Sequence, residues 1–204
     1  MLLERVAAGE LDGALRIWAP VPALALSRLD ELRQGADAAR TAAASAVLDS
    51  VVRVSGGHAV VLGPGSLCVG FAEAAVSFEG TQQRYEQFTA ALIDAFASLG
   101  IQAEQGELAG EWCPGAWSIR SGGVKLAGLA QRAIKGAAWA EAVVRLAPDP
   151  DGDELLAGVY EALELPLDPA TLGSVVEVAG RPISFAELAE PLRDQLVMPP
   201  YNAT

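Results

Sequence analysis

The sequence is poor in the residues that build structural metal sites and disulfide frameworks. It contains one histidine, His58, and two cysteines, Cys68 and Cys113, among 204 residues. A structural zinc site takes about four such ligands at close spacing, and a disulfide framework needs several pairs of cysteines. We therefore expect neither a structural metal nor a disulfide framework in this chain.

Basic residues and long apolar runs are also scarce. There are 14 Lys and Arg residues against 26 Asp and Glu residues, so the net charge is -12. Because nucleic acid binding demands a basic surface, this acidic net charge excludes nucleic acid as a main partner. No apolar stretch approaches the roughly 20 residues of a membrane span, and the acidic N-terminal residues lack the apolar core of a signal peptide. We expect a cytoplasmic protein without a membrane partner.

The pattern of apolar residues predicts one α+β domain over residues 1–204, with mainly antiparallel sheets packed against helices. The expected strands are 15–18, 49–54, 59–62, 67–72, 101–105, 117–120, 126–134 and 139–146. The expected helices are 2–12, 23–33, 35–46, 81–99, 153–163 and a C-terminal segment at 184–197. Because short turns join the strands 49–54, 59–62 and 67–72, they are expected to form an antiparallel sheet and no βαβ unit.

Helix 81–99 has the clearest periodicity of the chain. Tyr85, Phe88 and Phe96 recur with Leu92 and Leu99 at spacings of three and four residues. This pattern predicts that the aromatic side chains belong to the core and form no stacking platform.

One segment, SGGVKLAGLAQR at 121–132, carries a single lysine among small and apolar residues. Lys125 would lie on a strand that follows a Gly122-Gly123 turn, and small neighbours allow a ligand to approach closely. Its ammonium would suit a carboxylate, a phosphate or a developing oxyanion. The alternative is a solvated lysine on an edge strand, and the segment alone leaves both interpretations open.

A second segment, RVSGGHAV at 53–60, contains a glycine-rich turn. The backbone N–H groups of Gly56 and Gly57 can serve an anion, and Arg53 can face the same spot as Ser55. The alternative is an ordinary hairpin turn. His58 has no evident partner in the sequence, so we expect it at the rim of the turn.

Taken together, residues 123–132 and residues 53–60, the latter followed by 65–67, resemble two motifs of the family of lipoate-protein ligases and octanoyltransferases. The resemblance covers roughly residues 15–180 and implies a biotin/lipoate-ligase-like catalytic domain. It implies that Lys125 is catalytic and holds the acyl carboxylate or its activated carbonyl oxygen. The substrate-binding residues that it implies are Arg53, Gly56, Gly57, His58, Ala59, Gly65, Gly128, Ala130 and Gln131.

The resemblance also implies an activity, namely transfer of a lipoyl or octanoyl group to a lysine of a lipoyl-acceptor domain of the 2-oxoacid dehydrogenase or glycine-cleavage type. Lipoate or octanoate would be the substrate. Two activation routes stay open: ATP with Mg²⁺, or transfer from an already acylated protein. Residues 116–119 lack the Asn-Asp pair usual in ATP-dependent ligases, which weighs against adenylation. The alternative is a non-catalytic member that binds acyl groups or the acceptor domain. A biotin ligase is disfavoured because its motif is not visible.

Cys113 precedes the lysine motif in the segment EWCPG. A thiol near Lys125 could carry an acyl thioester. However, the octanoyltransferases that use a cysteine place it after the lysine motif, and no cysteine follows Lys125. We therefore expect transfer to survive the loss of Cys113, Cys68 to be a small core residue, and the loss of Lys125 to reduce transfer with little change in stability.

Overall fold

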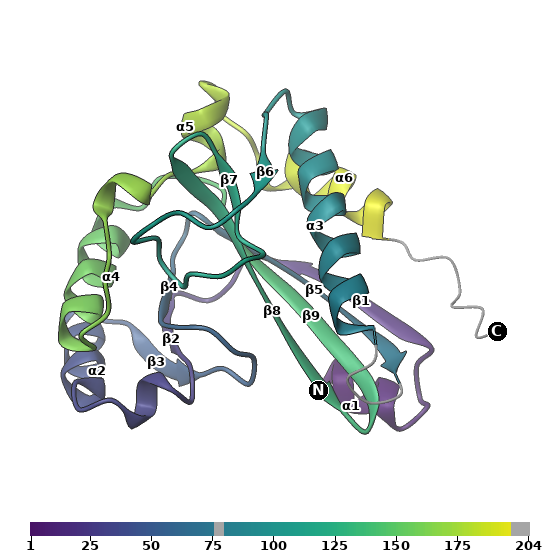
Figure 1. The fold of residues 1–204 in the computed structure, drawn as a ribbon, viewed down its shortest axis with the longest axis horizontal. Helices are drawn as coiled ribbons and strands as arrows, with labels where there is room; N and C mark the ends of the chain where they lie inside the picture. Colours follow the sequence, from purple (N-terminus) through teal and green to yellow (C-terminus); the bar gives the residue numbers. More distant parts are fainter. Residues whose placement is uncertain (76–79, 197–204) are drawn as a thin grey trace.

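The computed structural model describes residues 1–75 and 80–196, which form two sheets with helices alongside (Figure 1). In the larger sheet, neighbouring strands are all antiparallel. Its order is β1 (Gly13–Trp18), β5 (Ser66–Ala75), β9 (Gly136–Arg145), β8 (Val124–Ile134), β7 (Ile119–Ser121) and β6 (Glu104–Gln105). The smaller sheet has the order β3 (Asp49–Val52), β2 (Ala23–Leu26) and β4 (Val60–Leu62). This architecture confirms the predicted α+β class.

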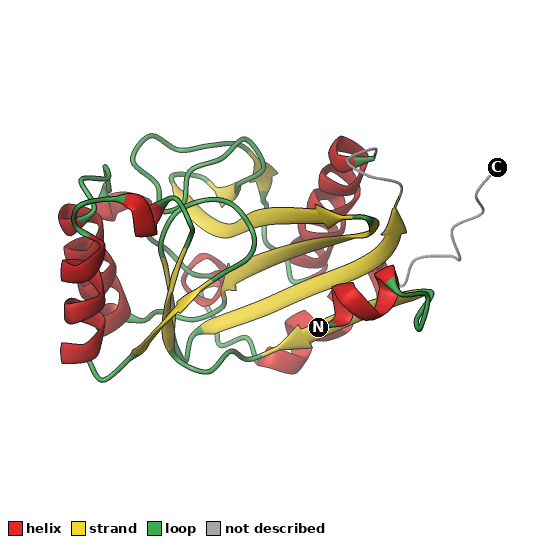
Figure 2. Ribbon diagram, turned by 90° about the horizontal axis from the view of Figure 1, so that it is seen from below, coloured by secondary structure: helices red, strands yellow, loops and turns green. Residues whose placement is uncertain are grey.

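Helices lie beside both sheets, and the short N-terminal helix packs against the larger sheet apart from the others (Figures 1 and 2). They are α1 (Leu2–Ala7), α2 (Ala36–Ser45), α3 (Thr81–Ser98), α4 (Pro150–Ala162), α5 (Val175–Ala179) and α6 (Phe185–Leu196), with 3-10 turns η1 (Asp30–Leu32) and η2 (Pro169–Thr171). Helices α3 and α6 pack together on the larger sheet, whereas α2 and α4 pack together beside the smaller one. No helix in the described ranges has the length and hydropathy that a bilayer crossing requires.

Helix α3 confirms the prediction for residues 81–99. Phe88, Leu92 and Phe96 are fully buried, and they pack with Leu67 and Leu126 of the larger sheet in one apolar core. Burying such side chains contributes about 1.5–3 kcal/mol each, so this stripe fixes the helix on the sheet.

Helix α6 begins as its sequence predicts. The Ser184 N–H donates to Glu187 Oε2 over 2.8 Å, and the Glu187 N–H donates to Ser184 Oγ over 3.2 Å, which completes a capping box. Pro191 lies inside the helix. The predicted last residue, Val197, falls outside the described residues.

The helix predicted at residues 23–33 is wrong. Residues 23–26 form strand β2, which is buried along its whole length, while Leu29 and Leu32 are exposed. The four-residue apolar run is the pattern of a strand buried on both faces, and periodicity alone does not separate it from a helix. What decides its structure is its position between β3 and β4.

The predicted antiparallel three-strand unit at residues 49–72 is also wrong. Strand β3 pairs parallel with β2, and helix α2 is the crossover between them, so a βαβ unit exists. Strand β4 pairs with the other side of β2, and β5 belongs to the larger sheet. The glycine-rich turn therefore connects two strands separated by β2, and it is not a hairpin. This arrangement carries the turn toward the larger sheet.

Candidate active site

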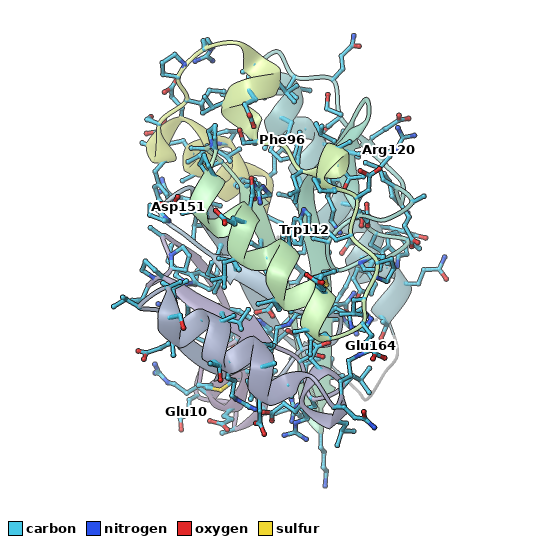
Figure 3. All side chains as sticks on the ribbon, turned by 90° about the vertical axis from the view of Figure 1, so that its left-hand side faces the viewer. Glu10, Phe96, Trp112, Arg120, Asp151 and Glu164 are labelled. Carbon is cyan, nitrogen blue, oxygen red and sulfur yellow. The ribbon has the colours of Figure 1, made fainter. Side chains whose placement is uncertain are left out.

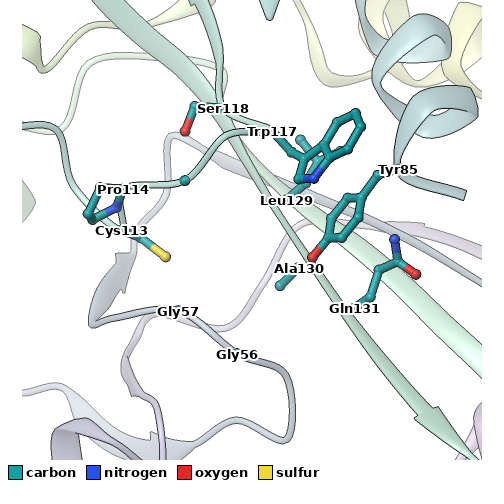
Figure 4. Close-up of a pocket in the computed structure, with 11 residues that line it drawn as sticks. Gly56, Gly57, Tyr85, Cys113, Pro114, Trp117, Ser118, Leu129, Ala130 and Gln131 are labelled. Carbon is teal, nitrogen blue, oxygen red and sulfur yellow. The ribbon is translucent and has the colours of Figure 1, made fainter. Parts of the chain in front are cut away.

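A cavity of about 180 Å³ lies where the glycine-rich turn, the loop before β7, strand β8 and helix α3 meet (Figure 4). Its lining is mostly small, apolar or aromatic and consists of Gly56, Gly57, Tyr85, Cys113, Pro114, Gly115, Trp117, Ser118, Leu129, Ala130 and Gln131. A second, narrower cavity shares Cys113, Leu129 and Ala130 with the first and adds Arg53, Gly128 and Glu141. Cys113 thus lies where the two spaces meet.

The Cys113 thiol is held by two donors from the glycine-rich turn. Its Sγ lies 3.2 Å from the backbone N of His58 and 3.3 Å from Nη2 of Arg53. Figure 4 shows the sulfur pointing into the open space beside Gly57. The same guanidinium also donates to the His58 carbonyl oxygen, which fixes it against the turn. These two contacts fix the position of the sulfur at the edge of the cavity.

The Cys113 backbone is strained. Its φ of 43° lies in the left-handed region, where a residue with a side chain costs roughly 1–3 kcal/mol unless its surroundings hold it. The Cys113 N–H donates to the Tyr160 hydroxyl, which in turn donates to the Ala59 carbonyl over 3.1 Å. Burial raises the pKa of Tyr160, so this hydroxyl keeps its proton for Ala59. Tyr160 thereby joins the glycine-rich segment to the loop 106–118 between β6 and β7, which carries Cys113 and is called the thiol loop below.

Lys125 lies beneath the same loop and is completely buried. Its Nζ donates to Glu111 Oε1 over 2.9 Å and to the carbonyl oxygens of Trp112 and Cys113 over 2.8 Å each. The ammonium also lies 4.4 Å from the centre of the Trp112 ring. Trp112 is itself buried, and its label lies near the middle of the molecule beside α4 in Figure 3. Burial lowers the pKa of the Lys125 ammonium, and the Glu111 carboxylate opposes that shift.

These contacts exclude one of the two interpretations of Lys125. Strand β8 lies between β9 and β7 and the side chain is buried, so the interpretation as a solvated lysine on an edge strand is wrong. The lysine also has a carboxylate partner, although Glu111 is 14 residues away in the chain. Local sequence could not reveal this pair because the loop before β7 folds back over the strand.

Glu111 organises that loop. It is fully buried, and its carboxylate accepts hydrogen bonds from the N–H groups of Leu108 and Gly115 and from the Ser118 hydroxyl, in addition to Lys125. A buried carboxylate persists only when it is paired and hydrogen-bonded in this way. The Glu111–Lys125 pair therefore fixes the path of the loop that presents Cys113.

Gly57 is required by the closeness of the thiol. Its φ is +95°, and a Cβ there would lie 2.5 Å from Cys113 Sγ and 2.7 Å from Arg53 Nη2. A Cβ on Gly128 would lie 3.2 Å from the Trp112 ring. Both glycines allow the backbone to approach the loop that carries Trp112 and Cys113.

The predicted substrate-binding residues lie in three places. Seven of them line the two cavities or donate to Cys113, and these are Arg53, Gly56, Gly57, His58, Gly128, Ala130 and Gln131. Ala59 lies one layer behind, where it accepts from Tyr160. Gly65 lies at the turn into β5, where a Cβ would meet the Ala147 carbonyl oxygen at 2.4 Å. The structure therefore gives Gly65 a packing role in a turn.

His58 has a partner that the sequence did not reveal. Its Nδ1 lies 2.9 Å from Oδ1 of Asp30. The Asp30 side chain is completely buried, whereas 23% of the His58 side-chain surface is exposed to solvent. Asp30 also accepts from the Ser27 N–H over 2.8 Å. The imidazole is thus anchored on the smaller sheet's side of the molecule, while its backbone N–H faces the thiol.

An aromatic pair that the sequence pattern did not reveal lies at the cavity. Tyr85 and Trp117 stack with their ring centres 5.0 Å apart and their planes 4° from parallel. Both are partly exposed, so the expectation that every aromatic residue of helix 81–99 lies in the core is wrong for Tyr85. The residue type alone could have indicated this position. Tyrosine combines an apolar ring with a polar hydroxyl and therefore favours the boundary between the core and solvent.

A family model described as lipoyl protein ligase A/B catalytic domain matches residues 1–197 of this chain. The chain belongs to this family. That membership confirms the resemblance drawn from the two motifs. Several curated proteins are also similar to this chain in sequence.

Two of these relatives are octanoyl-[GcvH]:protein N-octanoyltransferases. The one from Geobacillus kaustophilus strain HTA426 is 34% identical over 137 residues, which are 66% of this chain and 48% of that protein. The one from Bacillus velezensis strain DSM 23117 / BGSC 10A6 / LMG 26770 / FZB42 is 29% identical over 157 residues, 72% of this chain and 52% of that protein. The chain thus spans about half the length of the curated relatives that it matches.

Solved structures of the lipoyl protein ligase A/B family share the fold. Lipoate-protein ligase A bound with ATP has a TM-score of 0.74 at 18% identity, covering 95% of this chain and 76% of that one. Protein Ta0514 from T. acidophilum with bound lipoic acid has a TM-score of 0.68 at 19% identity, covering 90% and 70%. At these identities the likeness is one of fold.

Proposed function

We propose that this chain transfers an octanoyl or lipoyl group from an acylated protein to a lysine of a lipoyl-acceptor domain, through a thioester on Cys113. The observation that carries the proposal is the placement of Cys113 Sγ at the cavity, between the N–H of His58 and the guanidinium of Arg53. The names of the octanoyltransferase relatives support the octanoyl group and an octanoylated protein as its donor.

In the proposed first step, the Cys113 sulfur attacks the carbonyl carbon of the acyl-lysine amide on the donor domain. A carbon–sulfur bond forms, the carbon–nitrogen bond breaks, and the thiol's proton leaves with the released lysine amine. In the second step, the lysine amine of the acceptor domain attacks the thioester carbon, a new amide forms, and the sulfur departs and regains a proton. One amide is consumed and one is made, so the transfer needs no oxidant or reductant.

The cavity supports this route over adenylation. Among the described residues, no Lys, Arg, His, Asp or Glu lines the larger cavity, and only Arg53 and Glu141 do so in the narrower one. The triphosphate and Mg²⁺ of ATP need charged partners, whereas the ammonium of Lys125 is already bonded to protein acceptors. These residues do not fit Mg-ATP, and they do fit an apolar acyl chain that ends at a thiol.

The proposal changes the roles expected for two residues. Chain order placed Cys113 on the wrong side of the lysine motif, but folding brings it directly above Lys125, so we propose it as the nucleophile. We propose Lys125 as a positioning residue, which supports transfer by holding the carbonyl groups of Trp112 and Cys113. Arg53 and the His58 N–H would hold charge on the sulfur while the thioester forms and breaks.

The test is single-turnover transfer followed by intact-protein mass spectrometry. The purified chain is mixed with an octanoylated lipoyl-acceptor domain of the glycine-cleavage type, and then with an unmodified acceptor domain of the glycine-cleavage or 2-oxoacid dehydrogenase type. We expect one octanoyl group on the chain, its release by hydroxylamine as a thioester requires, and its transfer to the second domain. ATP with Mg²⁺ and free octanoate should give no product.

Two outcomes would contradict the proposal. Product formation only with ATP, Mg²⁺ and free octanoate would establish adenylation. Tight binding of the acylated domain without any acyl group on the chain, and without transfer, would establish the non-catalytic alternative.

A further inference from the structure

The stacked Tyr85 and Trp117 rings form the wall of the larger cavity on the side away from Cys113 (Figure 4). The space between sulfur and rings is bounded by Gly56 and Gly57 on one side and by Leu129 on the other. An acyl chain attached to Cys113 would therefore run along small and apolar residues and meet the two aromatic rings at its free end.

The aromatic wall is held firmly. Tyr85 lies on helix α3, and burial raises the pKa of its hydroxyl while a hydrogen bond with the Gln131 backbone opposes that shift. The Gln131 side chain in turn donates to the Thr81 carbonyl over 2.9 Å and accepts from Arg84 Nε over 2.9 Å. Trp117 is fixed by its stacking on the tyrosine, a contact between near-parallel rings. The wall thus joins α3, β8 and the thiol loop.

The wall is also thin. Tyr85 and Trp117 are both partly exposed, so within the described parts of the chain neither ring is enclosed by core on every side. Removing one ring would open the cavity to the outside and would not leave a closed void. A longer acyl chain could then extend through the gap.

We propose that the Tyr85–Trp117 pair sets the maximum length of the acyl chain that the enzyme accepts. This inference rests on the proposed transfer through Cys113 and names the feature that makes it selective for medium chains. A chain longer than the space between Cys113 and the rings must either displace a stacked ring or leave its last methylene groups unburied. Methylenes left in water gain nothing over octanoyl, whereas a chain that displaces a stacked ring loses the packing of that ring, which slows its transfer relative to octanoyl by about tenfold.

The experiment measures acylation of Cys113 by acceptor domains carrying hexanoyl, octanoyl, decanoyl or dodecanoyl groups, in the wild type and in Trp117→Ala. For the wild type we expect dodecanoyl transfer to be at least about tenfold slower than octanoyl transfer. In Trp117→Ala the two rates should agree within about threefold. Tyr85→Phe, which keeps the ring, should retain the wild-type preference, and Tyr85→Ala should lose it.

Trp18→Ala is the matched control, because this tryptophan lies on β1 with the Arg16 guanidinium 4.5 Å above its ring. It should leave the chain-length profile unchanged. Thermal stabilisation by free octanoate and dodecanoate provides a second readout that needs no chemistry, and Trp117→Ala should raise the dodecanoate shift to the octanoate level.

The outcomes separate the two proposals. An unchanged chain-length profile in both Trp117→Ala and Tyr85→Ala, by rate and by thermal shift, overturns the role of the aromatic pair and leaves the transfer intact. The absence of any Cys113 adduct in the wild type overturns the transfer, while the thermal shifts still decide whether the rings limit chain length.

Discussion

Lys125 and Cys113 are 12 residues apart in the chain, and the lysine Nζ donates to the cysteine carbonyl oxygen over 2.8 Å. The lysine thus supports the thiol loop from below, while the sulfur faces the cavity above. This relationship unites two segments that the sequence presents separately, and it leads to the first prediction.

Lys125→Met should destabilise the fold by about 3–5 kcal/mol, because it leaves the buried Glu111 carboxylate without its cationic partner. This reverses the expectation from sequence that the substitution would change stability little. Urea unfolding at pH 7 measures the loss. The double variant Lys125→Met with Glu111→Leu should recover a large part of it, and the exposed Lys135→Met is the matched control. Equal stability of the Lys125→Met and Lys135→Met variants would contradict the burial argument.

Cys113→Ser should abolish the acyl adduct and reduce transfer by at least ~10²-fold, since a serine hydroxyl is a far weaker nucleophile than a thiol without a neighbouring base. Intact mass and transfer to an acceptor domain measure the effect. Cys68→Ser is the control, because that thiol lies in strand β5 and pairs opposite Val143 of β9. Undiminished transfer by Cys113→Ser would restore the original expectation from chain order.

The two thiols should differ sharply toward iodoacetamide. Burial raises the pKa of Cys68 to about 12, so it remains a protonated, unreactive thiol at pH 8. Cys113 is partly exposed and should be alkylated in the folded protein. Peptide mass spectrometry after timed labelling distinguishes the two, and preincubation with the octanoylated domain should protect Cys113. Faster labelling of Cys68 than of Cys113 would argue against this assignment of exposure.

Gly57→Ala should lower the free energy of unfolding by more than ~1 kcal/mol, since alanine is strained at φ +95°. It should also displace the Cys113 side chain, because the new Cβ would lie 2.5 Å from Sγ. Urea unfolding and the rate of alkylation of Cys113 are the readouts. Gly56→Ala is the control for stability, as a Cβ there meets open space. The structure is contradicted if the two alanine variants unfold at the same urea concentration.

Glu187 should make the stability depend on pH in acid. Its hydrogen bonds with Ser184 lower the pKa of the carboxyl from 4.5 to about 2. The unfolded chain therefore takes up this proton first as the pH falls, so the stabilisation is present above pH 4.5 and is lost between about 4.5 and 2. The melting temperature of the wild type should exceed that of Glu187→Gln at pH 7, and the difference should vanish near pH 2. A constant difference across this range would rule out the charged cap.

Local sequence patterns determined several parts of this protein by themselves. The apolar stripe of α3 and the Ser184–Glu187 capping box act within a few residues, so periodicity and spacing are enough to reveal them. The two motifs around Gly57 and Lys125 likewise indicated the family. Their glycines are needed where the backbone lies close to the side chains of Cys113 and Trp112.

Only the tertiary structure decided which residues meet. The run 23–26 became a strand because β3 and β4 border it on both sides, and the ion pair of Lys125 depends on a loop 14 residues upstream. Tyr85 lies at the cavity and not in the core with the other aromatic residues of α3, because Trp117 of the thiol loop stacks on its ring. Cys113 seemed misplaced in chain order, yet the strained loop over Lys125 presents it to the cavity. Such contacts join residues far apart in the chain, and their energies arise only when the packed sheets bring these residues together.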